Sequence, residues 1–399
     1  MFDYTVFDIP TPYYVIDRAL IRRNMKILQD VQERSGCKIL LALKAFSTWC
    51  AFKDMAPYLA GVAASSYNEV RLGREEFGKL VQLYSPAYAD EEIKSVLPMV
   101  DYLVFNSEAQ FKLFHPHIKK IRDKEKRKIH CGYRINPEYS EVLTEIYNPC
   151  TSRSRFGIRI ETMHEISSLS GIDGFHFHTM CQQGSDVLVR TLELVEERFG
   201  KYFKKLKWIN FGGGHHITRA GYDVDQLCDV IADFRKRTKL EVFLEPGEAH
   251  VLNTGFLVSS VLDVNENPSS IDVAIVDTSA AAHMPDVLEM PYTPELVGAR
   301  RVVEIVDTDS PLEEGRYKYV IGGKTCLSGD LIGEYLFRKP LKIGDRVTFA
   351  DMSQYTICKN TMFNGLNPPS IVTCDSEVPG GAVEIVRRFG YEDFKSRLS

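Results

Sequence analysis

Short apolar runs alternate with longer amphipathic stretches up to about residue 255 of the chain. The stretches, such as residues 17–36 and 188–206, have the apolar spacing of helices. Eight of the apolar runs have the length and composition of buried strands, and they occupy residues 39–43, 59–65, 80–85, 102–106, 129–135, 174–179, 208–214 and 241–247. This alternation predicts parallel βα units, and eight units predict an α/β fold, a closed (β/α)8 TIM-like barrel.

The pattern changes after about residue 255, where β-branched runs follow one another with Gly, Pro and Asp between them. A C-terminal all-β domain is predicted by the runs FLVSSVLDV, DVAIVDTS, ARRVVEIVD, YKYVIGG, GDRVTFADM and AVEIVRRF. The run at 12–17 precedes the barrel pattern, and we expect it to pair with this domain. The expected divisions are an N-terminal segment at 1–24, a barrel at 25–258 and a β domain at 259–399.

Polar or glycine-rich positions follow the predicted barrel strands at their C-terminal ends. In such barrels these ends meet at one face, and active sites are built there. Seven runs end in this way, so the pattern favours a functional site over seven unrelated loop residues. The positions are Lys44, Ser65, Asn106, Arg134, His178, the glycines Gly212, Gly213 and Gly214, and Glu245.

Composition and charge narrow the function classes. The 399-residue chain is 44% apolar and 26% charged with a net charge of −5, so nothing indicates nucleic acid or an acidic membrane surface as a partner. No segment approaches the roughly 18 consecutive apolar residues of a membrane span, and the N-terminus lacks a signal-peptide pattern. Nine cysteines without CxxC pairs predict reduced thiols in a cytoplasm and no zinc site.

Two features of the predicted barrel suit an anionic group and a ring nitrogen. Gly212, Gly213 and Gly214 directly follow a strand, and glycine lets backbone N–H groups approach a phosphate, although a tight turn would use glycine too. Glu245 ends an apolar strand, where a carboxylate needs a partner. A protonated heterocyclic nitrogen would serve, and so would an ion pair with Arg134.

A lysine and a histidine pair complete the predicted chemistry. Lys44 ends the first barrel strand, either as an ordinary strand end or as a nucleophile. His176 and His178 could stack on an aromatic ligand or be ordinary hydrogen-bonded histidines, and no third metal ligand stands at suitable spacing. A lysine, a phosphate cradle, an aromatic stacker and a carboxylate together predict pyridoxal 5'-phosphate, with Lys44 forming the imine.

Two loops of the β domain hold further candidates. Cys326 and Asp330 lie four apart in a glycine-rich loop, where a thiol can deliver a proton and a carboxylate can hold a cationic substrate. A buried thiol without a role is the alternative for Cys326. Tyr355 precedes an FNG turn at 363–365, and both could serve packing alone.

The motifs LALKA, FHFH, FGGG, EPG, CLSGD and YT…FNG occur in an order that resembles the fold-type III pyridoxal-phosphate decarboxylases over nearly the whole chain. That family includes ornithine, diaminopimelate and carboxynorspermidine decarboxylases. The resemblance implies a barrel followed by a β domain, assembled as a head-to-tail homodimer with shared active sites.

The resemblance also implies roles for the matching residues. Cys326 and Asp330 would be contributed by the neighbouring subunit, with Cys326 protonating the carbanion after CO2 leaves. The implied cofactor site consists of Lys44 for the imine, His178 for ring stacking, Glu245 and Arg134 for the pyridine nitrogen, and Gly212, Gly213, Gly214 and Tyr355 for the phosphate.

Two departures from the family pattern bear on the substrate. The position after EPG is usually an arginine in the relatives, whereas here it is Glu248. Diaminopimelate decarboxylases carry an arginine where HMPDVLEMPY has Asp286 and Glu289, with none until Arg300. Carboxylates in place of cations should favour a distal ammonium. Both stretches resemble those of carboxynorspermidine/carboxyspermidine decarboxylases. We therefore expect Glu248 and Asp286 to bind the substrate amines, with Glu289 and Asp330 as the next candidates.

Three alternatives remain at the level of sequence. Another basic amino-acid decarboxylase of the same fold, for ornithine, lysine, arginine or diaminopimelate, would need fewer tail acids. A racemase would need a second base opposite the lysine. A non-catalytic, antizyme-inhibitor-like regulator would not need to retain Lys44, His178, Glu245 and Cys326. The tail lengths of carboxyspermidine and carboxynorspermidine differ by one methylene, which the sequence leaves undecided.

Overall fold

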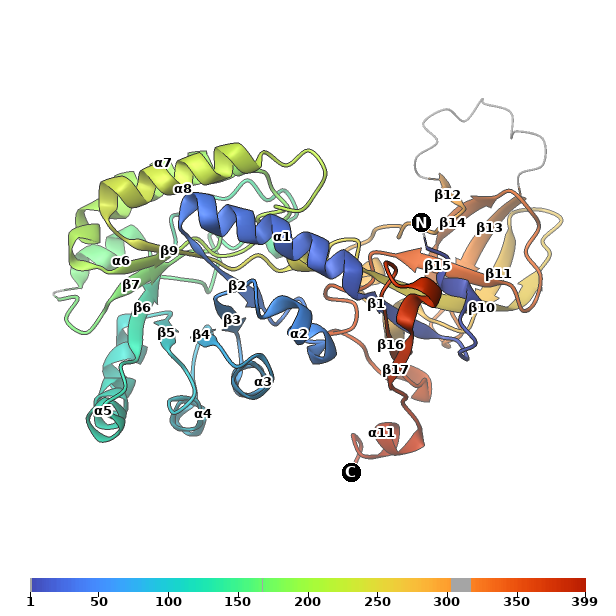
Figure 1. Ribbon diagram of the computed structural model, residues 1–399, viewed down its shortest axis with the longest axis horizontal. Coiled ribbons are helices and arrows are strands. Elements are labelled where there is room, and N and C mark those ends of the chain that lie inside the picture. The colour runs from blue at the N-terminus through green and yellow to red at the C-terminus, as the bar shows by residue number, and fades with distance from the viewer. Residues whose placement is uncertain (1, 167, 303–316) are drawn as a thin grey trace. The chain divides into compact units, whose positions relative to one another are not determined.

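The computed structural model describes residues 2–166, 168–302 and 317–399, and its contacts divide the chain into two units (Figure 1). The barrel unit comprises Arg22–His250, and the β unit combines Met1–Ile21 with Val251–Ser399. No helix in the described ranges combines the length and apolarity that a membrane crossing requires.

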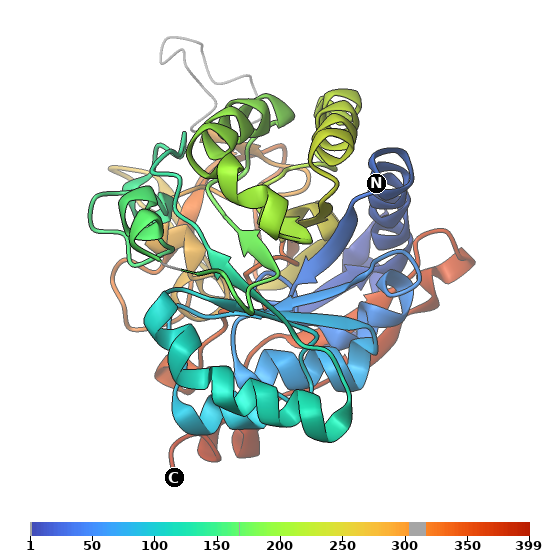
Figure 2. The ribbon, with the colours of Figure 1, turned by 90° about the vertical axis from the view of Figure 1, so that its left-hand side faces the viewer.

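The barrel unit is a ring of parallel strands with helices around it (Figure 2). Among the described residues eight strands close the ring, because β9 pairs back to β2 through Lys38 with Phe243 and Ile39 with Leu244. The predicted (β/α)8 barrel is confirmed. Its strands are β2 (Lys38–Ala42), β3 (Gly61–Ala64), β4 (Leu80–Tyr84), β5 (Tyr102–Phe105), β6 (His130–Arg134), β7 (Gly174–His176), β8 (Trp208–Asn210) and β9 (Glu241–Leu244).

The barrel helices begin at local capping signals. Ser66, Ser107 and Asp223 each accept a hydrogen bond from the backbone N–H three residues later, which satisfies one unpaired donor at the helix start. The helices between the strands, and the one that leads into the barrel, are α1 (Arg18–Ser35), α2 (Phe52–Met55), α3 (Tyr67–Leu72), α4 (Asp90–Val96), α5 (Glu108–Glu125), α6 (Ile160–Glu165), α7 (Ser185–Phe199) and α8 (Val224–Thr238).

Large aromatic side chains fill the barrel interior near the strand starts. Trp208 is 1% exposed, and the Tyr102 ring meets the Trp208 and Phe243 rings edge-on at centroid distances of 5.3 and 5.1 Å. Gly132 and Gly174 make room for the indole, because a Cβ at either position would overlap Trp208. Filling this end leaves the C-terminal ends of the strands for a pocket.

The β unit is built on a mixed sheet, in the order β12-β14-β13-β11-β10-β1-β16-β17 with β15 on β10. The C-terminal all-β prediction is confirmed, although the run at 299–307 falls largely outside the described residues. The strands are β1 (Tyr13–Asp17), β10 (Gly255–Asn265), β11 (Asp272–Val276), β12 (Arg300–Arg301), β13 (Tyr317–Gly322), β14 (Leu331–Phe337), β15 (Arg346–Ala350), β16 (Ser370–Cys374) and β17 (Glu384–Arg387); the short helices are α9 (Ala280–His283), α10 (Asp286–Glu289) and α11 (Tyr391–Lys395).

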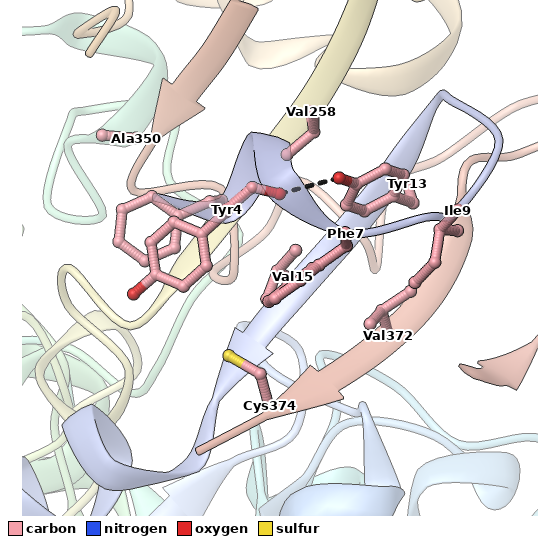
Figure 3. Close-up of a cluster of buried hydrophobic side chains, with 10 residues drawn as sticks. Tyr4, Phe7, Ile9, Tyr13, Val15, Val258, Ala350, Val372 and Cys374 are labelled. Carbon is pink, nitrogen blue, oxygen red and sulfur yellow. Dashed lines mark hydrogen bonds between the residues drawn. The ribbon is translucent and has the colours of Figure 1, made fainter. Parts of the chain in front are cut away.

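The N-terminal segment is part of this β unit. Strand β1 runs antiparallel to β10 and parallel to β16. Figure 3 shows the buried cluster beside it, in which the Tyr13 hydroxyl donates a 2.7 Å hydrogen bond to the Tyr4 carbonyl. The Tyr4 hydroxyl donates in turn to Asp17 at 2.8 Å, and its ring stacks on Phe256. These contacts hold the first residues of the chain on strands that lie more than 240 residues later.

We expect Gly174→Ala to lower the free energy of unfolding by about 1–3 kcal/mol, because the new methyl group must displace Trp208 inside a filled barrel. Chemical unfolding followed by fluorescence and circular dichroism measures the change. Gly200→Ala is the matched control, since a Cβ there meets no atom within 4 Å. Equal stability of the two variants would contradict this account of the barrel interior.

Candidate active site

A pocket of about 340 Å³ lies at the C-terminal ends of the barrel strands. Its wall includes five of the polar strand-end positions predicted from the sequence, each at or after the end of a different strand: Lys44, Ser65, Arg134, His178 and Glu245. The lining residues are Ala42, Lys44, Ala63, Ala64, Ser65, Tyr84, Pro86, Arg134, Ile146, Tyr147, Asn148, Pro149, Arg155, Phe156, His176, His178 and Glu245. The pocket therefore occupies the face predicted from the polar strand ends.

Lys44 stands in the tight turn that ends β2, where the Ala45 N–H donates to the Ala42 carbonyl at 3.0 Å. Its side chain is accessible within the pocket, while the protein packed around the amine removes most of its hydration. This desolvation lowers the pKa of Lys44; Glu245 opposes the shift and Arg134 adds to it. A lowered pKa increases the neutral fraction of the amine, which is the nucleophilic form.

Glu245 follows β9 and is held by two buried side chains. Asn210 donates from Nδ2 to Oε1 at 2.8 Å, and His176 Nε2 lies 3.3 Å from Oε2. Burial raises the pKa of Glu245, but His176, Lys44 and Asn210 more than offset it, so the net shift is downward and the carboxylate is ionised. Sequence reasoning missed the partnership with Asn210, whose signal was a polar residue at the end of the apolar run WINF.

Both strand histidines are neutral in this environment. Burial lowers the pKa of His176 and, together with Lys44 and Arg134, lowers that of His178 much further. The Gly213 N–H donates to His178 Nδ1 at 2.7 Å, so the His178 proton sits on Nε2. A neutral ring fixed at one edge is suited to lie against an aromatic ligand.

Arg134 does not form the ion pair with Glu245 that the sequence left open. Its guanidinium instead lies over the rings of Tyr84 and Phe156, at 4.6 and 4.4 Å from the centroids, and donates to the His178 carbonyl at 3.2 Å. The contact to His178 ties two strand ends together. Arg134 thus acts on the pocket through packing and through its charge.

The three glycines lie directly behind His178 and against the neighbouring backbone. Gly212 and Gly214 have positive φ angles of 74° and 86°, and a Cβ at any of the three would overlap backbone atoms of 177–181 or of Glu245. The Gly212 N–H already donates to Asn210 Oδ1 and the Gly213 N–H to His178. Within the described residues, the Gly214 N–H is the one of the three without an assigned acceptor.

Glu248 also lies in the barrel unit, at the start of the short helix η6 (Glu248–His250). Gln182 donates from Nε2 to its Oε1 at 3.0 Å, and His216 Nε2 lies 3.6 Å from Oε2. Burial lowers the pKa of His216 to about 4, so the imidazole is neutral.

Cys326, Asp330 and their surroundings belong to the β unit. Cys326 is exposed, and its N–H donates to Asn364 Oδ1 at 2.8 Å, so the FNG turn holds this loop. Asp330 is 3% exposed and accepts four hydrogen bonds, from the Ser279 hydroxyl, the Ala281 N–H, and the N–H and hydroxyl of Thr325. These bonds anchor the loop that carries Cys326, and the substrate contact expected for Asp330 stays a prediction.

Asp286 and Glu289, the other expected tail acids, lie on α10 and both form ion pairs with Lys359. Lys359 carried no signal in the sequence, because it comes from a segment some 70 residues away. Tyr355 stands one turn before Lys359, with a positive φ of 53° and its carbonyl accepting the Lys359 N–H at 2.9 Å.

The barrel pocket fits pyridoxal phosphate. It presents an amine of lowered pKa, an ionised carboxylate for a ring nitrogen and a neutral imidazole, and the three glycines pack against the neighbouring backbone of 177–181 and Glu245. Among the described residues, His, Cys, Asp and Glu side chains form no group of three or more suited to a metal ion.

Comparison with known proteins gives full-length matches. A profile of the family described as "Pyridoxal-dependent decarboxylase, C-terminal sheet domain" matches residues 13–353. The chain is 41% identical over 390 residues to the carboxynorspermidine/carboxyspermidine decarboxylase of Campylobacter jejuni, with 98% of each chain covered. It is 40% identical over 391 residues to the carboxyaminopropylagmatine decarboxylase of Synechocystis sp., covering 98% of this chain and 96% of the relative. A crystal structure of carboxynorspermidine decarboxylase from C. jejuni, complexed with norspermidine, superposes with a TM-score of 0.88 at 40% identity, covering 98% and 100% of the two chains.

We expect Lys44 in the cofactor-free protein to react with acylating reagents at lower pH than the surface lysines do. Its pKa is lowered, so its neutral amine appears below the ordinary lysine value of about 10.4. Competitive labelling with limiting acetic anhydride, read by mass spectrometry across pH, gives the midpoint for each lysine. In Glu245→Gln the Lys44 midpoint should fall further, because an anion that raises it is gone. A Lys44 midpoint in the surface range would contradict this electrostatic picture.

Proposed function

The chain belongs to the family of pyridoxal-dependent decarboxylases, and on this basis we propose that it decarboxylates carboxynorspermidine or carboxyspermidine, which yields norspermidine or spermidine. The substrate assignment rests on one observation, the full-length similarity to the C. jejuni decarboxylase of those two compounds. A solved relative at 40% identity holds norspermidine, the product of such a reaction. Polyamine biosynthesis is the corresponding role.

Bound pyridoxal phosphate supplies an aldehyde that combines with amines and a pyridine ring that withdraws electrons from the substrate α-carbon. Lys44 is our candidate to hold the aldehyde carbon, because its amine opens into the pocket and has a lowered pKa. The ionised Glu245 would keep the pyridine nitrogen protonated, since Asn210 and the neutral His176 orient it without supplying a positive charge. His178 would cover one face of the ring.

The phosphate would lie near the backbone of Gly212, Gly213 and Gly214. Among the described residues, the Gly214 N–H is the one of these three donors that has no assigned acceptor, while Gly212 and Gly213 pack against the neighbouring backbone. Tyr355 and Arg134 complete the proposed cofactor set, the first at the phosphate and the second in support of the ring-nitrogen side.

Cys326 is the proposed proton donor. After CO2 leaves, its Sγ proton would pass to the substrate α-carbon, and the thiol is exposed on a loop held by Asn364 and Asp330. The resemblance to the family supports a position of this loop in the active site of a partner subunit. We therefore propose a homodimer whose two active sites each use residues of both chains.

The substrate tail carries two ammonium groups, which require acidic partners. Glu248 of the barrel unit and Asp286 and Glu289 of the β unit are the proposed set, and α10 already binds a primary ammonium, that of Lys359. Asp330 anchors the loop that carries Cys326 and is a further candidate for binding the tail. The nine cysteines of the chain include no CxxC pair, which supports a reducing compartment, and we place the enzyme in the cytoplasm.

One of the relatives points to a second candidate substrate. The Synechocystis decarboxylase, which is 40% identical, is named for carboxyaminopropylagmatine. Agmatine ends in a guanidinium, which is planar and binds carboxylates in a forked geometry, whereas Lys359 presents a compact ammonium to the acid pair. The present arrangement favours the ammonium tail.

We expect the cofactor-loaded enzyme to release CO2 from carboxynorspermidine and carboxyspermidine in preference to carboxyaminopropylagmatine, diaminopimelate, ornithine, lysine and arginine. Glu248→Gln and Asp286→Asn should each lower kcat/KM for the carboxylated triamines about ten- to a hundredfold, because a hydrogen-bonded charge is lost. Lys44→Ala should lower kcat/KM by roughly a thousandfold or more.

Glu248→Gln and Asp286→Asn should affect the turnover of ornithine far less, because ornithine has a shorter tail. A preference for diaminopimelate or carboxyaminopropylagmatine would replace the substrate assignment and leave the family intact. Binding without any CO2 release would instead favour a regulatory protein.

We expect Lys44→Ala and Cys326→Ala chains to restore activity when they are refolded or expressed together. Each homodimer should be nearly inactive, but a mixed dimer contains one site with both residues intact. Random mixing gives half mixed dimers with one good site in two, which is about a quarter of parental activity. Activity no higher than that of the separate variants would rule out shared sites. The matched control is the Lys44→Ala/Cys326→Ala double variant mixed with either single variant, because no dimer in that mixture has an intact site.

A further inference from the structure

Lys359 places its ammonium between the two carboxylates of α10. Asp286 and Glu289 are three residues apart on one helical turn, and both accept from Lys359 Nζ. Burial lowers the pKa of Lys359, but the two carboxylates outweigh it and the net shift is upward, so the side chain is charged. Its side chain is 31% exposed, compared with 24% for Asp286 and 57% for Glu289, so the ammonium has a route to solvent.

The backbone on both sides of this contact is held in place. The Thr361 N–H donates to the Ala282 carbonyl at 2.9 Å, and the Tyr14 hydroxyl lies between Asn360 Oδ1, at 3.0 Å, and the His283 carbonyl. Lys359 therefore starts from a fixed point beside α9 and α10. Movement of Lys359 Nζ away from the acids needs only rotation of its flexible side chain.

The acid pair already binds the functional group that terminates a polyamine. Lys359 offers four methylenes and a primary ammonium, which matches the end of an aminobutyl or aminopropyl tail in charge, size and hydrogen-bond donors. Two carboxylates and one ammonium sum to a charge of −1. A second ammonium brought to the same carboxylates would meet repulsion from Lys359 and compete for the same oxygens.

We propose that Lys359 is a specificity-determining residue that occupies the position of the substrate's distal ammonium and is displaced when a polyamine tail binds. The inference rests on the proposed function, in which Asp286 and Glu289 bind that tail. Lys359 returns to the acids when the product leaves, so it weakens binding of substrate and product alike. It also offsets one of the two negative charges between turnovers.

The test is calorimetric binding of norspermidine and spermidine to the full-length, cofactor-loaded protein. Lys359→Met should bind either triamine about two- to tenfold more tightly than the parent, because the internal competitor is gone. The KM for the carboxylated triamine should fall in parallel. Lys359→Gln is measured beside it as a milder change, and Lys359→Arg, which keeps the cation, should remain close to the parent.

Three controls separate competition from a general loss of charge. Lys318 is also 31% exposed and pairs with a single acid, Glu334, at 3.0 Å, so Lys318→Met should leave triamine binding unchanged. A norspermidine analogue with a terminal hydroxyl in place of one amine should bind to Lys359→Met no more tightly than to the parent. In the Asp286→Asn background, Lys359→Met should likewise give little further gain.

The failure of this inference is distinguishable from the failure of the proposed function. Equal or weaker triamine binding in both Lys359→Met and Lys359→Gln, in a protein that still decarboxylates carboxylated triamines, overturns the displacement of Lys359 alone. A parent protein that neither binds triamines nor decarboxylates their carboxylated forms overturns the proposed function and, with it, this inference.

Discussion

Parallel strands that close into a ring leave all their C-terminal ends at one face, and this constraint arranges the candidate site. The ring interior is filled near the strand starts by Trp208, Tyr102 and Phe243, for which Gly132 and Gly174 make room. Space for a ligand therefore remains at the other end. Lys44, Arg134, His178 and Glu245 meet there although up to 200 residues separate them, because each one ends or follows a strand of the same ring.

Electrostatics inside the pocket depends on the neutrality of its histidines. An ionised Glu245 would be costly if it were buried without partners, yet Asn210 and a neutral His176 satisfy its oxygens without cancelling its charge. The same crowded surroundings lower the pKa of Lys44. A negative carboxylate and an amine with a raised neutral fraction are the two properties that a pyridinium nitrogen and an aldehyde require of a protein.

In the β unit, the acidic side chains of interest form hydrogen bonds or ion pairs with other residues of the same chain. The Asp330 carboxylate accepts four hydrogen bonds that hold the loop carrying Cys326 in place. Asp286 and Glu289 are instead paired with Lys359, whose partly exposed side chain can leave. Similar residue types thus have different roles, because burial and the number of hydrogen bonds differ.

The fold and most residue types of the candidate site could be predicted from the amino-acid pattern alone. Strand and helix periods are local properties, so the eight runs, the β-rich C-terminal part and the polar strand ends could be identified without coordinates. Partner choice was decided only by the tertiary structure. Whether Glu245 meets Arg134 or Asn210, which donors bond to Asp330, and that Lys359 reaches α10 all depend on packing between segments far apart in the chain. No local spacing encodes those contacts, because each follows from which side chains the folded backbone brings within hydrogen-bond distance.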